Sequence, residues 1–323
     1  MHRPFGPRET SQDRADELIG ACGFIGFASP EWWSGKGTNM NRLLMKILLA
    51  TDGSENTAQA TKAAVDIARR SGSELHLIHV WHDVHTPHAH AFVKSELRQQ
   101  GREILDGEVK RIGEKGGTVT RSHLREGRTF EEVIKLGEEL EADLLVVGSH
   151  GYRGVRRMLM GSQSEDIVHH AQCPVLVVKC GENVWPPARI VAGDDFSEDA
   201  RKAAKLAANL GTLFGARMLL LHAVPRLPKA STEAVEAKLE DRAGELEDIL
   251  KQWPQTRIVE GDSAEVLIEG AQEGEGPTLV AVGSRGLGPV GRLRLGSVST
   301  KVIRAGLGAV LVYPPLREGR LRR

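Results

Sequence analysis

The sequence has little cysteine, little aromatic character and no long apolar run. Its 323 residues include only three cysteines, Cys22, Cys173 and Cys180, and no two of them form a Cys-x2-Cys pair. This sparse set excludes a disulfide framework and a cysteine-rich zinc site, and it is typical of a reducing compartment. No stretch approaches the ~18 apolar residues that a spanning helix needs, and residues 1–20 lack the order of a signal peptide. We therefore expect a cytoplasmic protein without a membrane segment.

An excess of charge of one sign is also absent, because 43 Lys and Arg residues balance 43 Asp and Glu residues. Nucleic acid is therefore not an expected partner, and neither is a membrane surface. Hydrophobic residues make up 40% of the chain and charged residues 27%, which is ordinary for a globular protein. The 36 glycines and the 4% aromatic content favour α/β architecture over an all-β sandwich. The length suggests two domains.

Two long segments of the chain repeat each other. Residues 146–164, VVGSHGYRGVRRMLMGSQS, align without a gap with residues 281–299, AVGSRGLGPVGRLRLGSVS, a shift of 135 positions. Residues 47–80 likewise match residues 190–224, with about one residue inserted in the second copy. A period of this length is too long for a solenoid, so we interpret the chain as a duplicated domain.

The repeat divides the chain into two domains and three connecting or flanking segments. Residues 44–180 form domain 1, residues 181–187 a Pro-containing linker, residues 188–315 domain 2, and residues 316–323 a basic tail. Residues 1–43 show no sustained periodicity, and we expect a disordered extension. A docking segment built on Trp32 and Trp33 is the alternative.

Within each copy, short apolar runs alternate with amphipathic segments. In domain 1 we expect strands at 46–51, 75–81, 118–124, 143–149 and 174–179, and helices at about 56–71, 94–115, 129–141 and 163–171. Domain 2 repeats this order. Strands separated by helices of this length predict βαβ units, and therefore an α/β fold with a parallel sheet flanked by helices in each domain.

The loop after the fourth strand carries the pattern G-x2-G-x9-G-S in both copies. Its members are Gly148, Gly151, Gly161 and Ser162 in domain 1, and Gly283, Gly286, Gly296 and Ser297 in domain 2. Glycines permit close backbone approach to a ligand, and the final Gly-Ser opens a helix whose free N–H groups attract anions. Ligands of open α/β sheets bind outside the carboxyl ends of the strands, where this loop lies. We interpret it as a phosphate-binding loop. The alternative is a helix cap without a ligand, in which Ser162 and Glu165 form a capping box.

These features resemble tandem members of the universal stress protein family. The resemblance rests on the duplicated glycine loop, the TDGS turn at 51–54, the His79-Val80 pair and CPVLVV at 173–178, and it covers residues 44–180 and 188–315. It implies two Rossmann-like domains, similar to adenine nucleotide alpha hydrolases, each with five parallel strands. It also implies that domains 1 and 2 pair with each other. In the subclass that carries the motif, it implies binding of ATP together with Mg²⁺.

The resemblance also implies which residues bind the nucleotide. Asp52 would face the adenine or ribose, the Val80 backbone the adenine edge, and Gly161 to Ser164 the phosphates. In domain 1 the implied set is Asp52, Val80, Gly148, Gly151, Gly161, Ser162, Gln163 and Ser164. In domain 2 it is Asp194, Ala223, Gly283, Gly286, Gly296, Ser297, Val298 and Ser299. The second turn reads GDDFS, so Asp195 is an alternative to Asp194.

Taken together, these features predict a nucleotide-dependent sensor or regulator of a stress response, with an adenine nucleotide as ligand. No catalytic constellation is evident, so we do not expect an enzyme. A slow ATP hydrolase or phosphotransferase assisted by Asp52 is one alternative, and a dimeric scaffold without nucleotide is another. A homodimer of the whole chain stays open, and no regulatory protein partner is identified. We predict no metal site, although His82, His85, His88 and His90 leave metal binding as an alternative to a solvated loop.

Overall fold

Alternating strands and helices form both copies of the repeat. The computed structural model describes residues 44–82, 91–149, 160–225, 232–284, 295–305 and 307–315. All of them belong to the unit that spans Arg42–Arg323. The expected extension 1–43 and tail 316–323 lie outside the described residues.

Domain 1 contains five strands and four helices among its described residues. In chain order they are β1 (Lys46–Ala50), α1 (Ala58–Ser71), β2 (Glu74–Trp81), α2 (Ala91–Glu114), β3 (Arg121–Glu126), α3 (Thr129–Leu140), β4 (Leu144–Gly148), α4 (Ser162–His170) and β5 (Val175–Val178). A short 3-10 turn, Glu55–Thr57, precedes α1. The strand expected at 118–124 begins three residues late. The chain turns through Gly116 at a φ of +73° before it reaches the sheet.

Domain 2 repeats this order within its described residues. The elements are β6 (Arg189–Gly193), α5 (Glu198–Phe214), β7 (Arg217–Val224), α6 (Thr232–Leu250), β8 (Gln255–Glu260), α7 (Ser263–Gln272), β9 (Thr278–Gly283), α8 (Ser297–Arg304) and β10 (Ala309–Tyr313). Helices α1 and α5 end in the same way, with Gly72 at a φ of +71° and Gly215 at +68°. Glycine is favoured at both positions because other residues rarely adopt this left-handed conformation.

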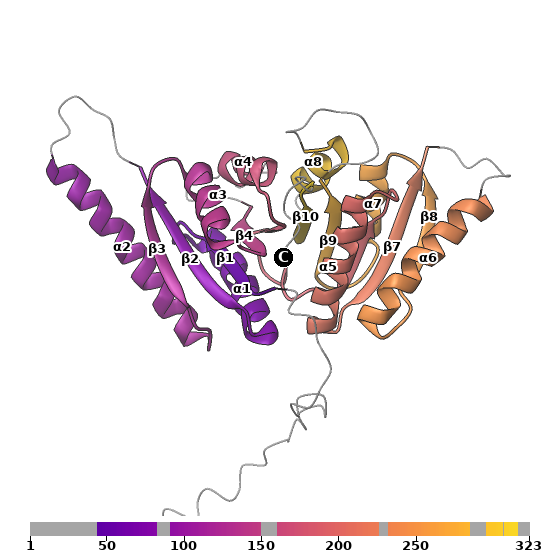
Figure 1. The fold of residues 1–323 in the computed structure, drawn as a ribbon, viewed down its shortest axis with the longest axis horizontal. Helices are drawn as coiled ribbons and strands as arrows, with labels where there is room; N and C mark the ends of the chain where they lie inside the picture. Colours follow the sequence, from indigo (N-terminus) through magenta and orange to yellow (C-terminus); the bar gives the residue numbers. More distant parts are fainter. Residues whose placement is uncertain are drawn as a thin grey trace, which may run out of the picture. The chain divides into compact units, whose positions relative to one another are not determined.

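The ten strands form one sheet in the order β3-β2-β1-β4-β5-β10-β9-β6-β7-β8. Pairing is parallel within each domain, whereas β5 and β10 pair antiparallel and so join the two domains. Leu176 lies opposite its own counterpart, Leu311. The two domains are therefore related by an approximate twofold axis at this pair, as Figure 1 shows.

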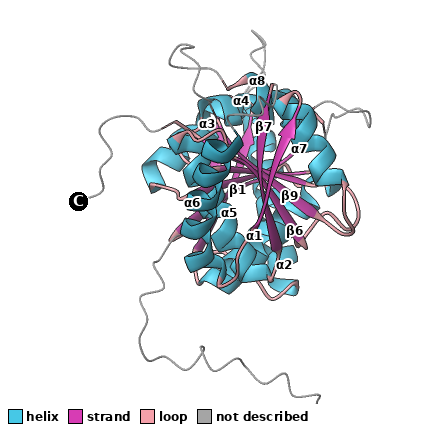
Figure 2. Ribbon diagram, turned by 90° about the vertical axis from the view of Figure 1, so that its right-hand side faces the viewer, coloured by secondary structure: helices cyan, strands magenta, loops and turns pink. Residues whose placement is uncertain are grey.

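Helices cover both faces of the sheet (Figures 1 and 2). Helices α1, α2, α5 and α6 pack on one face through a core that includes Ile67, Leu77 and Leu210. Helices α3, α4, α7 and α8 pack on the other face, where Ile78, Leu136 and Val302 are buried. Leu77 and Ile78 are neighbours on opposite faces, which is the alternation expected of a strand. Because both faces are covered, the central strands are almost continuously apolar.

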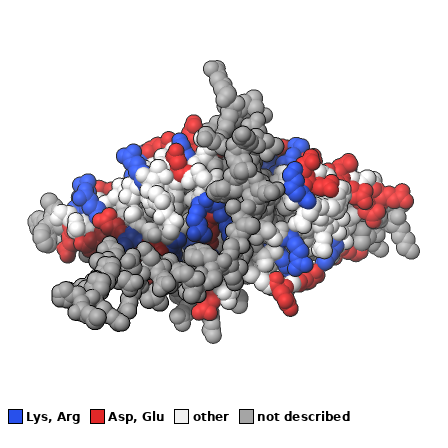
Figure 3. Space-filling view, turned by 90° about the horizontal axis from the view of Figure 1, so that it is seen from below, with Lys and Arg blue, Asp and Glu red and all other residues white. Residues whose placement is uncertain are grey.

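Two further features are the limited apolar character of the helices and the distribution of charge on the surface. Among the described helices, none combines the length and the apolar character needed to cross a membrane. Figure 3 shows basic and acidic side chains interspersed over the described part of one face, in keeping with the balanced charge of the chain.

The α/β class and the parallel arrangement predicted from the sequence are confirmed. In each domain the second and third strands lie on one side of the first strand, and the fourth and fifth strands lie on the other side. The carboxyl ends of β1 and β4, and of β6 and β9, therefore flank a topological switch point, where open α/β sheets bind their ligands.

Candidate functional site

The two glycine loops end in helices of the same construction. Gly161 is the N-cap of α4 and Gly296 is the N-cap of α8, both with extended backbone. The Gly161 N–H donates to the Ser149 carbonyl at 2.8 Å, and the Gly296 N–H donates to the Ser284 carbonyl at 2.7 Å. We call residues 161–164 cradle 1 and residues 296–299 cradle 2. Their matching bonds hold each helix start beside the end of the fourth strand of its domain.

The third helical residue of each cradle is a buried serine that fixes the helix to the strand. The Ser164 hydroxyl donates to the Gly148 carbonyl and the Ser299 hydroxyl to the Gly283 carbonyl, each at 2.7 Å. Their hydroxyl protons are therefore already engaged within the protein. A phosphate contact of Ser164 or Ser299 stays a prediction, and it would involve the backbone N–H.

The first residues of the cradles remain accessible. Ser162, Gln163 and Ser297 are exposed, and Val298 is half-buried. The first N–H groups of a helix have no acceptor within the helix, and the helix dipole favours an anion beside them. The Gln163 side-chain carbonyl accepts the Phe130 N–H at 3.2 Å, so this residue also links α4 to α3.

The capping-box interpretation of Ser162 and Glu165 is wrong. Ser162 is already inside α4, and the N-cap is Gly161, which has no side chain to accept a hydrogen bond. Glu165 instead forms an ion pair with Arg304 of α8 at 2.5 Å. The helix start therefore has no side-chain cap of its own.

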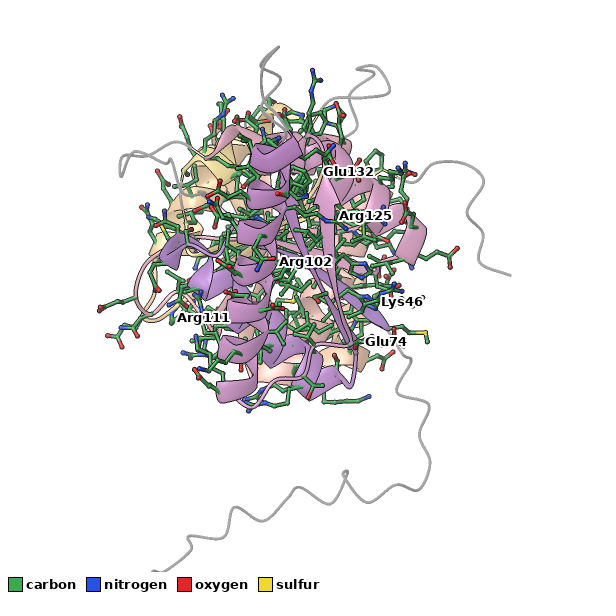
Figure 4. The ribbon with its side chains drawn as sticks, turned by 90° about the vertical axis from the view of Figure 1, so that its left-hand side faces the viewer. Lys46, Glu74, Arg102, Arg111, Arg125 and Glu132 are labelled. Carbon is green, nitrogen blue, oxygen red and sulfur yellow. The ribbon has the colours of Figure 1, made fainter. Side chains whose placement is uncertain are left out.

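The turn after β1 lies beside cradle 1, because β1 pairs with β4. Asp52 Oδ1 accepts hydrogen bonds from the Ser54 N–H at 3.0 Å and the Ser54 hydroxyl at 2.7 Å. Gly53 has a φ of +75°, and its carbonyl accepts from Arg111 of α2, which Figure 4 labels. His79 is buried, and its Nδ1 lies 2.9 Å from the Thr51 carbonyl oxygen. The structure thus brings the Asp52 turn, the end of β2 with Val80, and cradle 1 to one edge of the sheet.

In domain 2 the counterpart of Asp52 is Asp195, and the correspondence with Asp194 is wrong. The Asp194 N–H donates to Leu221 and its carbonyl contacts His222, as Thr51 does with Ile78 and His79. Asp195 then accepts the Ser197 N–H as Asp52 accepts that of Ser54. Ala223 follows His222 as Val80 follows His79, so Ala223 lies at the position of Val80, and its contact with a nucleotide stays a prediction.

Asp194 instead forms a buried ion pair. Its Oδ2 accepts from Arg242 Nε of α6 at 2.8 Å, and its Oδ1 accepts from the Phe196 N–H at 2.7 Å. Burial raises the pKa of Asp194, and the neighbouring Arg242 opposes that rise. The buried carboxylate of Asp194 therefore stabilises the turn after β6 from inside the protein and is not available as a ligand contact.

The predicted residues that remain are the other loop glycines and the possible metal ligands. Gly151 and Gly286 lie outside the described residues. A Cβ atom on Gly283 would lie 2.8 Å from the Ala200 N of α5, so packing alone requires glycine there. Among the described residues, no group of three or more His, Cys, Asp or Glu side chains could hold a metal ion. His85, His88 and His90 lie outside that part of the chain.

Sequence reasoning missed Ser284, which lies directly after Gly283 at cradle 2. Its side chain is only 4% exposed, and among the described residues its hydroxyl has no hydrogen-bond partner. A buried hydroxyl without a partner is costly, so it favours a ligand or a water molecule at that point. The repeated Gly-Ser step at 148–149 and 283–284 was the available signal.

Comparisons with known proteins agree with this architecture. The model of the Universal stress protein family matches residues 44–179 and 187–314. A universal stress protein of Mycobacterium tuberculosis is 29% identical over 289 residues, covering 82% of this chain and 96% of that protein. One of Methanocaldococcus jannaschii is 33% identical over 146 residues, covering 44% of this chain and 85% of that protein. The crystal structure of a universal stress protein from Archaeoglobus fulgidus has the same fold, with a TM-score of 0.66 and 23% identity over 83% of this chain and 98% of that one.

Proposed function

Since the chain belongs to the universal stress protein family, with one family domain in each half, we propose that it binds an adenine nucleotide, ATP with Mg²⁺, in each domain and acts as a nucleotide-dependent regulator. The observation that carries the proposal is the duplicated cradle. Two helices begin at the switch points of their domains, with matching glycine N-caps and matching serine bonds. Neither start has a side-chain cap, so the first N–H groups of both helices are without the acceptor that a cap would supply. This favours an anionic ligand at both positions.

The residues of each cradle fit a phosphate chain. The backbone N–H groups of the exposed residues Ser162 and Gln163 supply donors at the positive end of α4, where a phosphate is stabilised. Cradle 2 offers the equivalent backbone donors together with the hydroxyl of Ser284, which has no hydrogen-bond partner within the described part of the chain. Bound Mg²⁺ would offset the negative charge of the phosphates.

The nucleoside would lie over the neighbouring strand ends. In domain 1 this is the space beside the Asp52 turn and the end of β2 at Val80, and in domain 2 it lies beside Asp195 and Ala223. Asp52 and Asp195 hold their turns through Ser54 and Ser197, so their carboxylates are fixed in position before a ligand arrives. Fixed groups of this kind reduce the ordering cost of binding.

The experiment is isothermal titration of the full chain, freed of co-purified nucleotide, with ATP and Mg²⁺. We expect about two equivalents for the wild type, one each for Gly161→Val and Gly296→Val, and none for the double variant. Gly107→Val is the matched control, because Gly107 is exposed on α2 and a Cβ there meets open space. Binding absent from the wild type, or retained by the double variant, would refute the proposal.

The proposal includes no catalytic step. A phosphate-release assay on the titrated samples tests this part separately. Steady release by the wild type that disappears in the double variant would replace the regulator with a slow ATP hydrolase.

A further inference from the structure

Helices α4 and α8, which begin at the two cradles, contact each other across the domain boundary (Figure 1). Glu165 Oε1 of α4 lies 2.5 Å from Arg304 Nη2 of α8. His169 Nδ1 of α4 accepts the backbone N–H of Leu295 at 3.3 Å. Both bonds join a side chain of α4 to domain 2, one at the last residue of α8 and the other at the residue before cradle 2.

On each side of this contact, one residue is next to, or bonded to, the N-cap of its helix. Leu295 directly precedes Gly296, the N-cap of α8. Glu165 donates its backbone N–H at 3.0 Å to the carbonyl of Gly161, the N-cap of α4. Met160 and Leu295, each the residue before its cradle glycine, lie together where α4 meets α8. A continuous path of bonded and packed groups therefore runs from cradle 1 to cradle 2.

The two halves contribute different residues to this path. The shift of 135 positions places Thr300 at the position of Glu165 and Arg304 at the position of His169. A second Glu–Arg pair related by the twofold axis is therefore impossible. The acceptors come from α4, and the donors come from Leu295 and Arg304.

We propose that the two cradles are energetically coupled, so that an anion held in cradle 1 raises the affinity of cradle 2. This inference rests on the proposed nucleotide binding. A phosphate on the first N–H groups of α4 restricts that helix and, with it, Glu165 and His169. These side chains then hold Arg304 and Leu295, so less freedom remains to be lost when cradle 2 binds. Coupling of this kind typically changes affinity by about 5-fold or more.

The test compares titrations of the full chain with ATP and Mg²⁺. Gly161→Val gives the affinity of cradle 2 alone, and Gly296→Val gives that of cradle 1 alone. If the cradles are coupled, the wild type binds its second ATP more tightly than the sum of the two single-cradle curves predicts, by about 5-fold or more. A His169→Ala, Arg304→Ala double variant is expected to match the sum, because it loses the two bonds that link α4 to Leu295 and Arg304. Glu165→Gln, a milder change, is expected to give an intermediate result.

Lys301→Ala is the matched control. Lys301 also lies on α8, but its ion pair with Asp262 at 3.1 Å stays inside domain 2, so coupling should persist. Thermal melts establish that each variant is folded. A wild-type curve equal to the sum of the single-cradle curves, or coupling that survives loss of both cross-domain bonds, overturns the inference and leaves two independent sites. Binding absent from the wild type instead refutes the proposed function and the coupling with it.

Discussion

Replacing Arg242 by methionine should expose the cost of an unpaired buried carboxylate. The side chain of Asp194 is fully buried and that of Arg242 is 12% exposed, with Nε and Oδ2 2.8 Å apart. Methionine retains most of the apolar stem of arginine, so the change removes the positive charge with little loss of packing. The Phe196 N–H remains as a donor to Asp194.

The magnitude follows from the geometry. Unit charges 2.8 Å apart attract by about 6 kcal/mol at an effective dielectric constant of about 20. Part of this attraction is offset by the desolvation of Arg242, which the variant no longer needs. Loss of one partner from a buried pair typically costs about 3–5 kcal/mol. We expect a loss in this range in the free energy of unfolding at pH 7.

The pH dependence gives a second, sharper expectation. Burial raises the pKa of Asp194, and Arg242 opposes the rise. Without Arg242 the folded-state pKa rises further above the unfolded value. A carboxyl with a raised pKa destabilises the folded state above that pKa, and protonation relieves the cost as the pH falls through it. The stability difference between variant and wild type should therefore shrink from pH 7 to pH 5.

The assay is urea unfolding followed by circular dichroism at both pH values. Lys62→Met is the control, because its ion pair with Asp66 lies on the surface of α1 and should contribute less than about 1 kcal/mol. A loss below about 1 kcal/mol for Arg242→Met at pH 7, or a difference that grows on acidification, would refute the reasoning.

Three other perturbations test the bonds around the site and the first domain. Ser164→Ala leaves the Gly148 carbonyl without its 2.7 Å donor and should lower the free energy of unfolding by about 1–3 kcal/mol, measured by urea unfolding. Thr61→Val removes a 2.5 Å donor to the fully buried Glu108; we expect a loss of about 1.5–3 kcal/mol, and an unchanged midpoint would contradict this. Burial and the neighbouring His76 lower the pKa of His123 from 6.5 to about 4, so the unfolded chain takes up a proton first and stability falls as the pH drops through that window. His123→Gln should remove on the order of 1–2 kcal/mol of this acid sensitivity, after allowance for partial exposure, and equal pH profiles would refute it.

Most of the fold could be predicted because the signals are local. Apolar runs that are buried on both faces and helices that end at a glycine such as Gly72 are visible in the sequence. The start of β3 was misplaced because residues 118–120 have the composition of a strand and lie before the ladder begins. Strand propensity alone does not show at which residue a strand begins to pair with its neighbour.

The site was predicted less completely, and the reasons differ from residue to residue. The assignment of Asp194 failed because two adjacent aspartates fit the pattern, and only the bonds to Leu221 and His222 separate them. The capping-box prediction is wrong because α4 begins one residue earlier than expected, with Gly161 and not Ser162 as the N-cap, and Glu165 pairs with Arg304 of the other domain. The contact between His169 and Leu295 spans 126 positions and depends on how the domains pair.

The antiparallel pairing of β5 with β10 has a consequence for how the two halves can diverge. When identical subunits pair about a twofold axis, every contact occurs twice and each substitution acts on both sides at once. Here both partners of the β5–β10 pair are parts of one chain, so they are present at a fixed ratio. A substitution in one half can then be answered in the other alone, as with Glu165 and Arg304. Gene duplication has thus released this interface from self-complementarity, and the two cradles, which have a common origin, are free to diverge from each other.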